Sequence, residues 1–167
     1  MSVYSRYTRE DNLCQCNGYF SSNLRRKSVD AILNLLHLTS ASSVCWVGCG
    51  DGRELLWIAQ QHPEVQFTAF EINADALRIA RRVADIEGIE NVKLYNEDFM
   101  TCSKTFSHVY STALAGPRLY AALFSACSLR ICLLREMWDA QVDGMERANV
   151  QIAGSGERRQ LWCANIN

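Results

Sequence analysis

The stretch that decides the fold reads Ser43-Val44-Cys45-Trp46-Val47-Gly48-Cys49-Gly50-Asp51-Gly52, a short apolar run followed by three glycines spaced two residues apart. The segment that follows, Arg53 to Gln61, has apolar residues at helical spacing. This order predicts a strand, a glycine turn and a helix. Glycines let a ligand approach the backbone closely, and the first N–H groups of the helix point toward that ligand. The stretch therefore predicts a small-molecule site.

Strands and helices are expected to alternate on both sides of this turn. The apolar pattern predicts helices at residues 22–37, 53–61, 74–87 and 117–127, and strands at 43–47, 65–72, 92–95, 107–112 and 130–135. After a short helix or loop at 139–148, a hairpin is expected from strands at 150–153 and 160–166 around Gly154-Ser155-Gly156-Glu157. We therefore predict an α/β fold: a doubly wound, mostly parallel seven-stranded sheet with helices on both faces and a C-terminal antiparallel hairpin.

The length of 167 residues fits one domain. Residues 1–21 are polar and aperiodic and are expected to form an N-terminal arm or lid, while residues 22–167 form the Rossmann-like domain. The net charge of −1 gives no overall attraction to nucleic acid or to an anionic membrane. No apolar run approaches the roughly 20 residues that span a bilayer, and the N-terminus lacks a signal peptide's apolar core. An intracellular, cytoplasmic protein without a membrane partner is expected.

Eight cysteines are present, but no Cys-x-x-Cys pair occurs. Several of them, such as Cys45, Cys132 and Cys163, lie inside apolar runs, where cysteine behaves as a small hydrophobic residue. The expectation is reduced, buried thiols and no metal site.

Two carboxylates follow later strands of the predicted sheet. In doubly wound sheets, ligands bind beyond the carboxyl ends of the strands. Glu71 closes the second strand, 19 residues beyond Gly52, a separation suited to a carboxylate that accepts both hydroxyls of a ribose. Asp98 follows the third strand. Glycines and acids on three successive strands predict a nucleoside-like ligand.

With these residues the chain resembles the class I S-adenosylmethionine-dependent methyltransferases over roughly residues 28–167. Their glycine motif looks like Val47 to Gly52, their ribose acid matches Glu71, and their adenine-contacting acid matches Asp98. The resemblance implies S-adenosylmethionine as cofactor and methyl transfer to an acceptor that stays open: a protein side chain, RNA or a small molecule. It also implies a set of cofactor-binding residues, namely Gly48, Cys49, Gly50, Asp51, Gly52, Glu71, Ile72, Asp98 and Phe99.

A narrower resemblance concerns the disruptor-of-telomeric-silencing histone lysine methyltransferases. It rests on Gly18 to Ser21, Val29 to Leu33 and Phe70-Glu71-Ile72. That family has an Asn-rich segment after the fourth strand, whereas this chain has Tyr110-Ser111-Thr112 there. The mismatch leaves the acceptor undetermined.

Catalytic candidates lie at the C-terminal end of the fourth predicted strand. Tyr110 could line a substrate slot and Ser111 could orient a nucleophile by a hydrogen bond. The alternative is that these residues only reflect strand propensity, and His108 is expected to be a structural histidine of the sheet.

One departure from the family is Trp46, at a position where these methyltransferases usually have an acid that faces the methionine part of the cofactor. Asp51 or Glu54 could replace that acid.

The departure at Trp46 leaves other functions open. The chain could be a catalytically degenerate binding or scaffold subunit, or another protein with this fold, such as a nicotinamide-dependent reductase or an aminopropyltransferase. The lack of a third dinucleotide glycine at Arg53 argues against the reductase. A protein partner that completes the substrate site is also expected.

Overall fold

The computed structural model describes residues 23–111, 117–134, 146–151 and 158–166. The arm or lid expected at residues 1–21 and the hairpin turn expected at residues 154–157 lie outside them. The elements, in chain order, are α3 (Asn23–Leu36), β1 (Ser43–Val47), α4 (Arg53–Gln61), β2 (Gln66–Phe70), α5 (Ala74–Glu87), β3 (Val92–Tyr95), the 3-10 turn η2 (Phe99–Thr101), β4 (Phe106–Ser111), α6 (Pro117–Ser125), β5 (Cys127–Leu134), β6 (Glu146–Gln151) and β7 (Arg158–Asn165).

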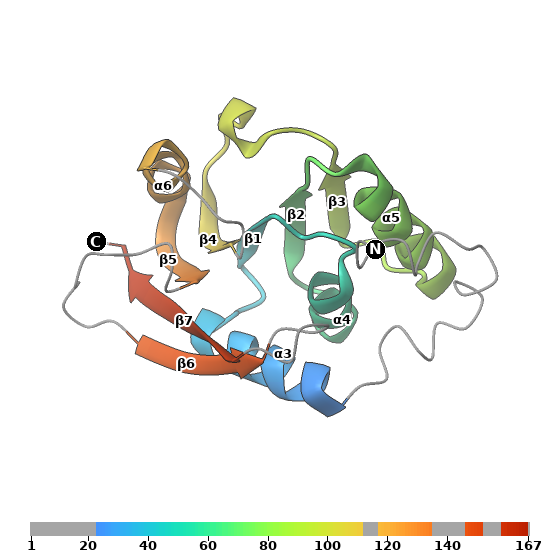
Figure 1. Ribbon diagram of the computed structural model, residues 1–167, viewed down its shortest axis with the longest axis horizontal. Coiled ribbons are helices and arrows are strands. Elements are labelled where there is room, and N and C mark those ends of the chain that lie inside the picture. Colours follow the sequence, from blue (N-terminus) through green and yellow to red (C-terminus); the bar gives the residue numbers. More distant parts are fainter. Residues whose placement is uncertain (1–22, 112–116, 135–145, 152–157, 167) are drawn as a thin grey trace.

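The strands form one sheet in the order β3-β2-β1-β4-β5-β7-β6 (Figure 1). From β3 to β5 all neighbouring strands are parallel, and β7 is antiparallel to both β5 and β6. Strand order reverses beside β1, because β2 lies on one side of it and β4 on the other. The α/β class, the mostly parallel sheet and the C-terminal antiparallel pair are thereby confirmed. The reversal is the place where ligands bind in this kind of fold.

Local chemistry explains why α5 begins and ends where the sequence predicts. The side chain of Asn73 accepts hydrogen bonds from the backbone N–H groups of Asp75 and Ala76, at 3.0 and 3.1 Å. Gly88 ends the helix with a left-handed φ of 65°, which glycine adopts without a Cβ penalty. Both boundaries therefore follow from single residues.

The core lies between the sheet and its helices. Its largest fully buried side chains come from the inward faces of these elements and include Leu36, Leu56, Phe67, Leu77 and Ile131. Strand β1 is buried from Val44 to Val47, as expected for a central parallel strand covered on both faces. In the described part of the chain, no helix combines the length and the apolar character needed to cross a bilayer.

The largest differences from the predicted element boundaries lie in the C-terminal third. Strand β5 begins at Cys127 rather than Arg130. Strand β6 begins at Glu146, inside the segment expected to be a helix or loop through Ala148, so that prediction is wrong from residue 146 onward. The reason is long-range pairing: Glu146 lies opposite Cys163 of β7.

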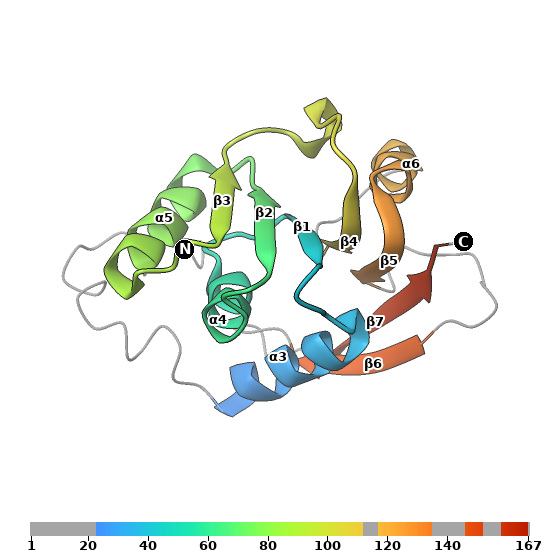
Figure 2. The same ribbon diagram turned by 180° about the vertical axis from the view of Figure 1, so that it is seen from behind.

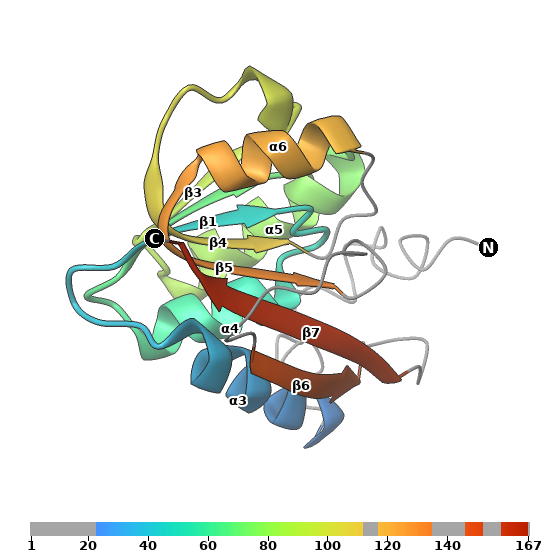
Figure 3. The ribbon, with the colours of Figure 1, turned by 90° about the vertical axis from the view of Figure 1, so that its left-hand side faces the viewer.

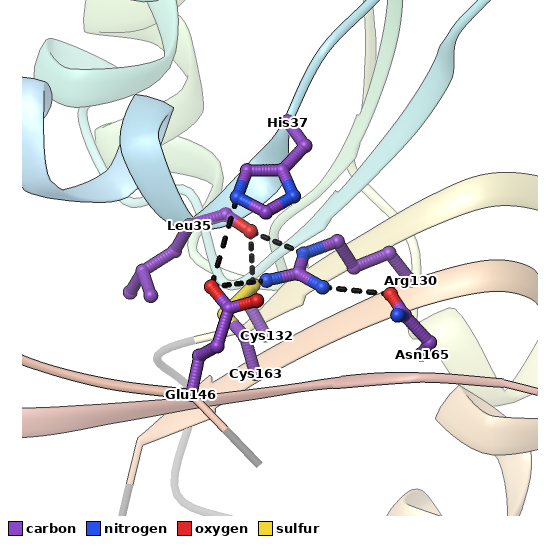
Figure 4. The surroundings of a disulfide bond; sticks show 7 residues. All are labelled: Leu35, His37, Arg130, Cys132, Glu146, Cys163 and Asn165. Carbon is purple, nitrogen blue, oxygen red and sulfur yellow. Dashed lines mark hydrogen bonds and ion pairs between the residues drawn. A yellow bond between two sulfur atoms is a disulfide. The ribbon is translucent and has the colours of Figure 1, made fainter. Parts of the chain in front are cut away.

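Cys132 and Cys163 form a disulfide, which overturns the expectation of reduced thiols for this pair (Figure 4). The two residues face each other in the antiparallel register of β5 and β7, with their Cα atoms 4.2 Å apart. The sequence gives no sign of this pairing, because 31 positions separate the two cysteines. Cys45, Cys49, Cys102 and Cys127 are free thiols, in line with the expectation.

Arg130 joins the C-terminal strands to α3 (Figure 4). Its side chain is buried, and its Nε donates to the carbonyl of Leu35 near the end of α3. Its Nη1 donates to Asn165 Oδ1 at 2.7 Å, and its Nη2 forms an ion pair with Glu146 Oε2 at 2.8 Å. Figures 2 and 3 show α3 lying alongside β6, so the start and the end of the described chain pack together.

Candidate functional site

A cavity of about 370 Å³ opens at the carboxyl ends of β1, β2 and β3. Leu119 of α6 contributes to its wall. The full set of lining residues is Val47, Gly48, Phe70, Glu71, Ile72, Glu97, Asp98, Phe99 and Leu119. The cavity lies beside the strand-order reversal, at the edge of the sheet where the sequence predicts a ligand.

Val47 and Gly48, where β1 passes into the glycine turn, form the β1 side of this cavity. Gly48, Gly50 and Gly52 have φ angles of 76°, 58° and 78°, which are left-handed values that favour glycine. The N–H of Gly48 donates to the carbonyl of Phe70 at 2.8 Å, which ties the turn to the end of β2. Gly52 is the N-cap of α4, so the turn leads directly into the helix N-terminus, as predicted.

Glu71 is fixed between the glycine turn and the start of α5. Its Oε2 accepts a hydrogen bond from the N–H of Gly50, and its Oε1 accepts one from the N–H of Asn73, each at 2.8 Å. A carboxylate has about four acceptor sites, so two bonds leave capacity for a ligand. Both bonds hold the carboxylate in one orientation at the cavity wall.

Asp98 and Phe99 form the β3 side of the cavity. The Asp98 side chain caps η2 by accepting from the N–H of Met100 at 3.0 Å. Phe99 is buried, and its ring makes an edge contact with Phe70 at a centroid distance of 5.4 Å. Asn96 donates to the carbonyls of Glu71 and Ile72, at 2.9 and 3.2 Å, so the ends of β2 and β3 keep a fixed spacing.

Five of the predicted cofactor-binding residues line the cavity together: Gly48, Glu71, Ile72, Asp98 and Phe99. Val47, Phe70, Glu97 and Leu119 also line it and were missed. The first three adjoin predicted residues in sequence, so their proximity was the available signal. The sequence gave no such signal for Leu119, because only the packing of α6 brings this residue to the cavity.

Cys49, Gly50, Asp51 and Gly52 are predicted site residues that are not among the residues lining the cavity. The thiol of Cys49 is buried, and this burial, together with the nearby Glu71 carboxylate, raises its pKa to about 12. Asp51 Oδ2 lies 2.6 Å from Arg53 Nε, and Arg53 is itself buried. These side chains therefore stabilise the turn. Their contact with a ligand stays a prediction.

Tyr110 and Ser111 are buried in the sheet and are not among the lining residues. Burial, and to a lesser extent Glu54, raises the pKa of Tyr110 well above 10, so its phenol stays protonated at neutral pH. Ser111 donates to the carbonyl of Val47 at 3.1 Å. His108 is also buried, with Nδ1 2.8 Å from Ser107 Oγ, and burial lowers its pKa. The catalytic roles of Tyr110 and Ser111 stay predictions.

The cavity wall has a marked charge pattern. Glu71, Glu97 and Asp98 are the charged residues among those that line it, and all three carry carboxylates. Carboxylates accept hydrogen bonds from hydroxyl and amino groups and attract cations. The wall therefore suits a ligand that combines hydroxyl groups with a positive charge.

The glycine turn allows a prediction with an internal control. A Cβ at Gly52 would lie 2.9 Å from the Cβ of Ala80, whereas a Cβ at Gly88 would meet nothing within 4 Å, although both residues have positive φ. Gly88→Ala should lower the free energy of unfolding by about 1 kcal/mol, through backbone strain alone. Gly52→Ala should lower it by about 2 to 4 kcal/mol, because the clash adds to that strain. Urea denaturation followed by circular dichroism measures both losses, and equal losses would contradict the clash.

Comparison with known proteins places this site in a family. The model of a family described as "Methyltransferase domain" matches residues 38–129, which include the glycine turn, Glu71, Asp98 and strand β4. No curated protein sequence matches the chain.

Several solved structures share the fold. An RNA methyltransferase from Salinibacter ruber, in complex with S-adenosyl-L-homocysteine, is 21% identical, with a TM-score of 0.67, 84% of this chain covered and 91% of the other. TrmN from Thermus thermophilus is 16% identical, with a TM-score of 0.67, 81% of this chain covered and 47% of the other. A mutant of MtNAS in complex with S-adenosylmethionine is 14% identical, with a TM-score of 0.68, 98% of this chain covered and 70% of the other. The chain thus spans about half the length of TrmN.

The family model matches more than half of this chain. The chain therefore belongs to the methyltransferase-domain family.

Proposed function

We propose that this protein binds S-adenosylmethionine in the cavity at the ends of β1, β2 and β3 and transfers its methyl group to an acceptor. The observation that carries the proposal is Glu71, whose carboxylate is held by the N–H groups of Gly50 and Asn73 between the glycine turn and Asp98. A carboxylate fixed in this way can accept both hydroxyls of a ribose. Solved structures of the same fold hold S-adenosylhomocysteine or S-adenosylmethionine, which supports this assignment.

The order of the strands suggests how the nucleoside lies. With the ribose at Glu71, Asp98 and Phe99 would hold the adenine, because Phe99 and Phe70 offer apolar ring surface there. Val47 and Gly48, at the end of the cavity formed by β1, would then lie nearest to the sulfur. The three lining carboxylates favour the positive charge of a sulfonium.

S-adenosylmethionine, when bound, would supply a methyl group on a sulfonium, with the neutral thioether S-adenosylhomocysteine as the leaving group. This chain contributes by positioning the acceptor, since alignment of the acceptor's nucleophile with the methyl group provides much of the rate acceleration. The high pKa of Tyr110 excludes its phenolate as the base at neutral pH. Any role of Tyr110 is therefore to donate a hydrogen bond or to pack beside the acceptor. Ser111 is proposed to act indirectly, by holding Val47 at the cavity.

The acceptor is a protein side chain, RNA or a small molecule. Apart from the three carboxylates, the described residues that line the cavity carry no side chain that could serve as a base. We therefore propose that a protein partner completes the acceptor side.

A second candidate is a cofactor-binding scaffold subunit without catalysis. It is favoured by Trp46, which stands where these enzymes usually have an acid, and by the burial of Tyr110 and Ser111.

A labelled-methyl transfer assay separates the two proposals. The purified chain is incubated with methyl-labelled S-adenosylmethionine and separated protein, RNA and metabolite pools from a lysate. Labelling of one pool, and its loss when excess S-adenosylhomocysteine is added, supports the enzyme and names the acceptor class. Cofactor binding by calorimetry without labelling of any pool supports the scaffold. Absence of cofactor binding contradicts both.

A further inference from the structure

Strand β3 is the edge strand at one end of the sheet, and its connection to β4 differs from the other parallel crossovers (Figures 1 and 2). Helices α4, α5 and α6 occupy the connections that lead to β2, β3 and β5. Residues 96–105, which lead from β3 back to β4, are all described and contain only the 3-10 turn η2. Because this crossover runs in the opposite direction to those of α4 and α5, its right-handed form lies on the opposite face of the sheet. That face of β2 and β3 therefore receives no α-helix from this crossover.

The side chains on that face of β2 and β3 include a lysine and a tyrosine. Thr68 is the register partner of Lys93, and Phe70 is that of Tyr95. Because alternate residues of a strand share a face, these four side chains point to the same side of the sheet. Lys93 is exposed, and Thr68 and Tyr95 are half-buried, whereas Phe67 on the other face is only 1% exposed. The face with Lys93 and Tyr95 is therefore the one that solvent reaches.

Two further cations lie beside Tyr95 and its strand. The Tyr95 ring packs nearly parallel to that of Phe70, with an interplanar angle of 17° and a centroid distance of 5.4 Å. Lys104, which precedes β4, is exposed, and its Nζ lies 6.0 Å from the centroid of the Tyr95 ring. Arg81 of α5 is also exposed, and its Nη2 donates to the carbonyl of Leu94 at 3.1 Å, which holds the guanidinium beside β3. We refer to four of these residues as the β3-edge surface, namely Arg81, Lys93, Tyr95 and Lys104.

Charges of opposite sign are separated at this end of the sheet. The cavity wall carries the carboxylates of Glu71, Glu97 and Asp98, whereas none of the four residues of the β3-edge surface lines the cavity. Three of those four residues are cations. A polyanion is therefore attracted to the β3-edge surface and repelled by the cavity. The net charge of −1 does not reveal this attraction, because it averages the two regions.

We infer that the β3-edge surface binds single-stranded nucleic acid, with a base stacked on Tyr95 and phosphates paired with the three cations. An aromatic side chain among cations suits a single strand, because every base offers a π-face and every nucleotide carries a phosphate. The guanidinium of Arg81 also matches phosphate in a bidentate geometry. An acidic peptide would pair with the cations but has no base to stack on Tyr95. The inference goes beyond the proposed function and does not rest on it, since this surface lies outside the cavity.

Fluorescence anisotropy with a labelled single strand tests the inference on the unmodified protein. Strands of about 12 nucleotides, within the usual range of site sizes, are used as RNA and as DNA of the same sequence. Binding of either strand supports the inference, and the tighter of the two identifies the kind of nucleic acid. The affinity should fall with salt, and Lys93→Gln and Lys104→Gln should each reduce the slope of log affinity against log salt by about 0.7. Absence of binding to both strands overturns the inference and leaves the proposed function intact.

Matched variants separate the contribution of charge from that of stacking. Arg78→Gln removes an exposed cation of α5 that already pairs with Asp75 at 3.9 Å, and it should leave the affinity within about twofold. Tyr95→Leu should weaken binding by about tenfold, because it removes the ring on which a base stacks. Tyr95→Phe keeps the ring and should bind like the unmodified protein.

The remaining outcomes decide against the surface or its occupant. Equal salt slopes for Arg78→Gln and the two lysine variants would mean that the strand binds elsewhere. A Tyr95→Leu variant that is folded by circular dichroism and binds as tightly as Tyr95→Phe would exclude stacking, as would a duplex that binds as tightly as the single strand. Displacement of the strand by an equal concentration of an oligoglutamate peptide would show a site for acidic peptides instead. The lysine variants should bind S-adenosylhomocysteine with unchanged affinity, which distinguishes loss of this surface from loss of the cofactor site.

Discussion

Replacing Glu71 by alanine is expected to weaken the binding of S-adenosylhomocysteine by about 100-fold, or about 2.7 kcal/mol. The reason is the loss of two charge-assisted hydrogen bonds to the ribose hydroxyls, each worth about 1.5 to 3 kcal/mol before compensation by water. The same substitution removes the bond from the Gly50 N–H to Oε2, which helps to shape the turn. Isothermal titration calorimetry of the variant and the unmodified protein measures the loss.

Asp75→Asn is the matched control for this experiment. Asp75 is an exposed carboxylate in the first turn of α5, four residues from Glu71, and it does not line the cavity. Its neutralisation changes the local charge by the same amount and should leave the affinity within about twofold. If Glu71→Ala binds as tightly as the unmodified protein, the ribose is not at Glu71. Equal losses in both variants would mean that overall charge, rather than a specific contact, governs binding.

The second large effect concerns the disulfide between Cys132 and Cys163. Cys163→Ala should lower the free energy of unfolding by about 3 to 4 kcal/mol, because the denatured chain regains the conformational entropy that a closed loop of this size removes. The estimate follows from the sequence separation of 31. The loss adds to that from any packing defect, because both cysteines are fully buried between β5 and β7. Guanidinium denaturation without reductant measures it.

Reductant provides the control for the disulfide. Dithiothreitol should bring the unmodified protein close to the stability of Cys163→Ala and should leave that variant unaffected. Cys102→Ser replaces a free, half-buried thiol and should behave like the unmodified protein with and without reductant. A midpoint for the unmodified protein that does not respond to reductant would show that the disulfide does not contribute to stability in solution.

Much of the first half of the fold follows from local sequence. The glycines of the turn, the cap at Asn73 and the stop at Gly88 each act within a few residues, so the ends of β1, α4 and α5 could be read directly. The same holds for the site, because a carboxylate at the end of a parallel strand projects to a known edge of the sheet. The positions of Glu71 and Asp98 at this edge could therefore be predicted from the sequence, and both residues line the cavity.

The features that escaped prediction depend on contacts between distant segments. The sequence predicts Arg130 as the first residue of the fifth strand but does not predict its burial. That burial depends on Leu35, Glu146 and Asn165, which supply partners from three other elements. The start of β6 and the disulfide depend on the same antiparallel register. Tyr110 is a different case, since the sequence placed it correctly at the end of β4 but could not show that it packs against Trp46.

The packing of α3 against β6 has a consequence for how this protein can vary. Both elements lie outside the segment matched by the family model, one before residue 38 and one after residue 129. Each covers the other, and Arg130 ties them through Leu35 and Glu146. Removal of α3 would uncover the edge strand β6 and take away the Leu35 carbonyl that accepts a hydrogen bond from Arg130. The two flanking segments thus depend on each other for packing, and we expect related sequences to gain or lose them together.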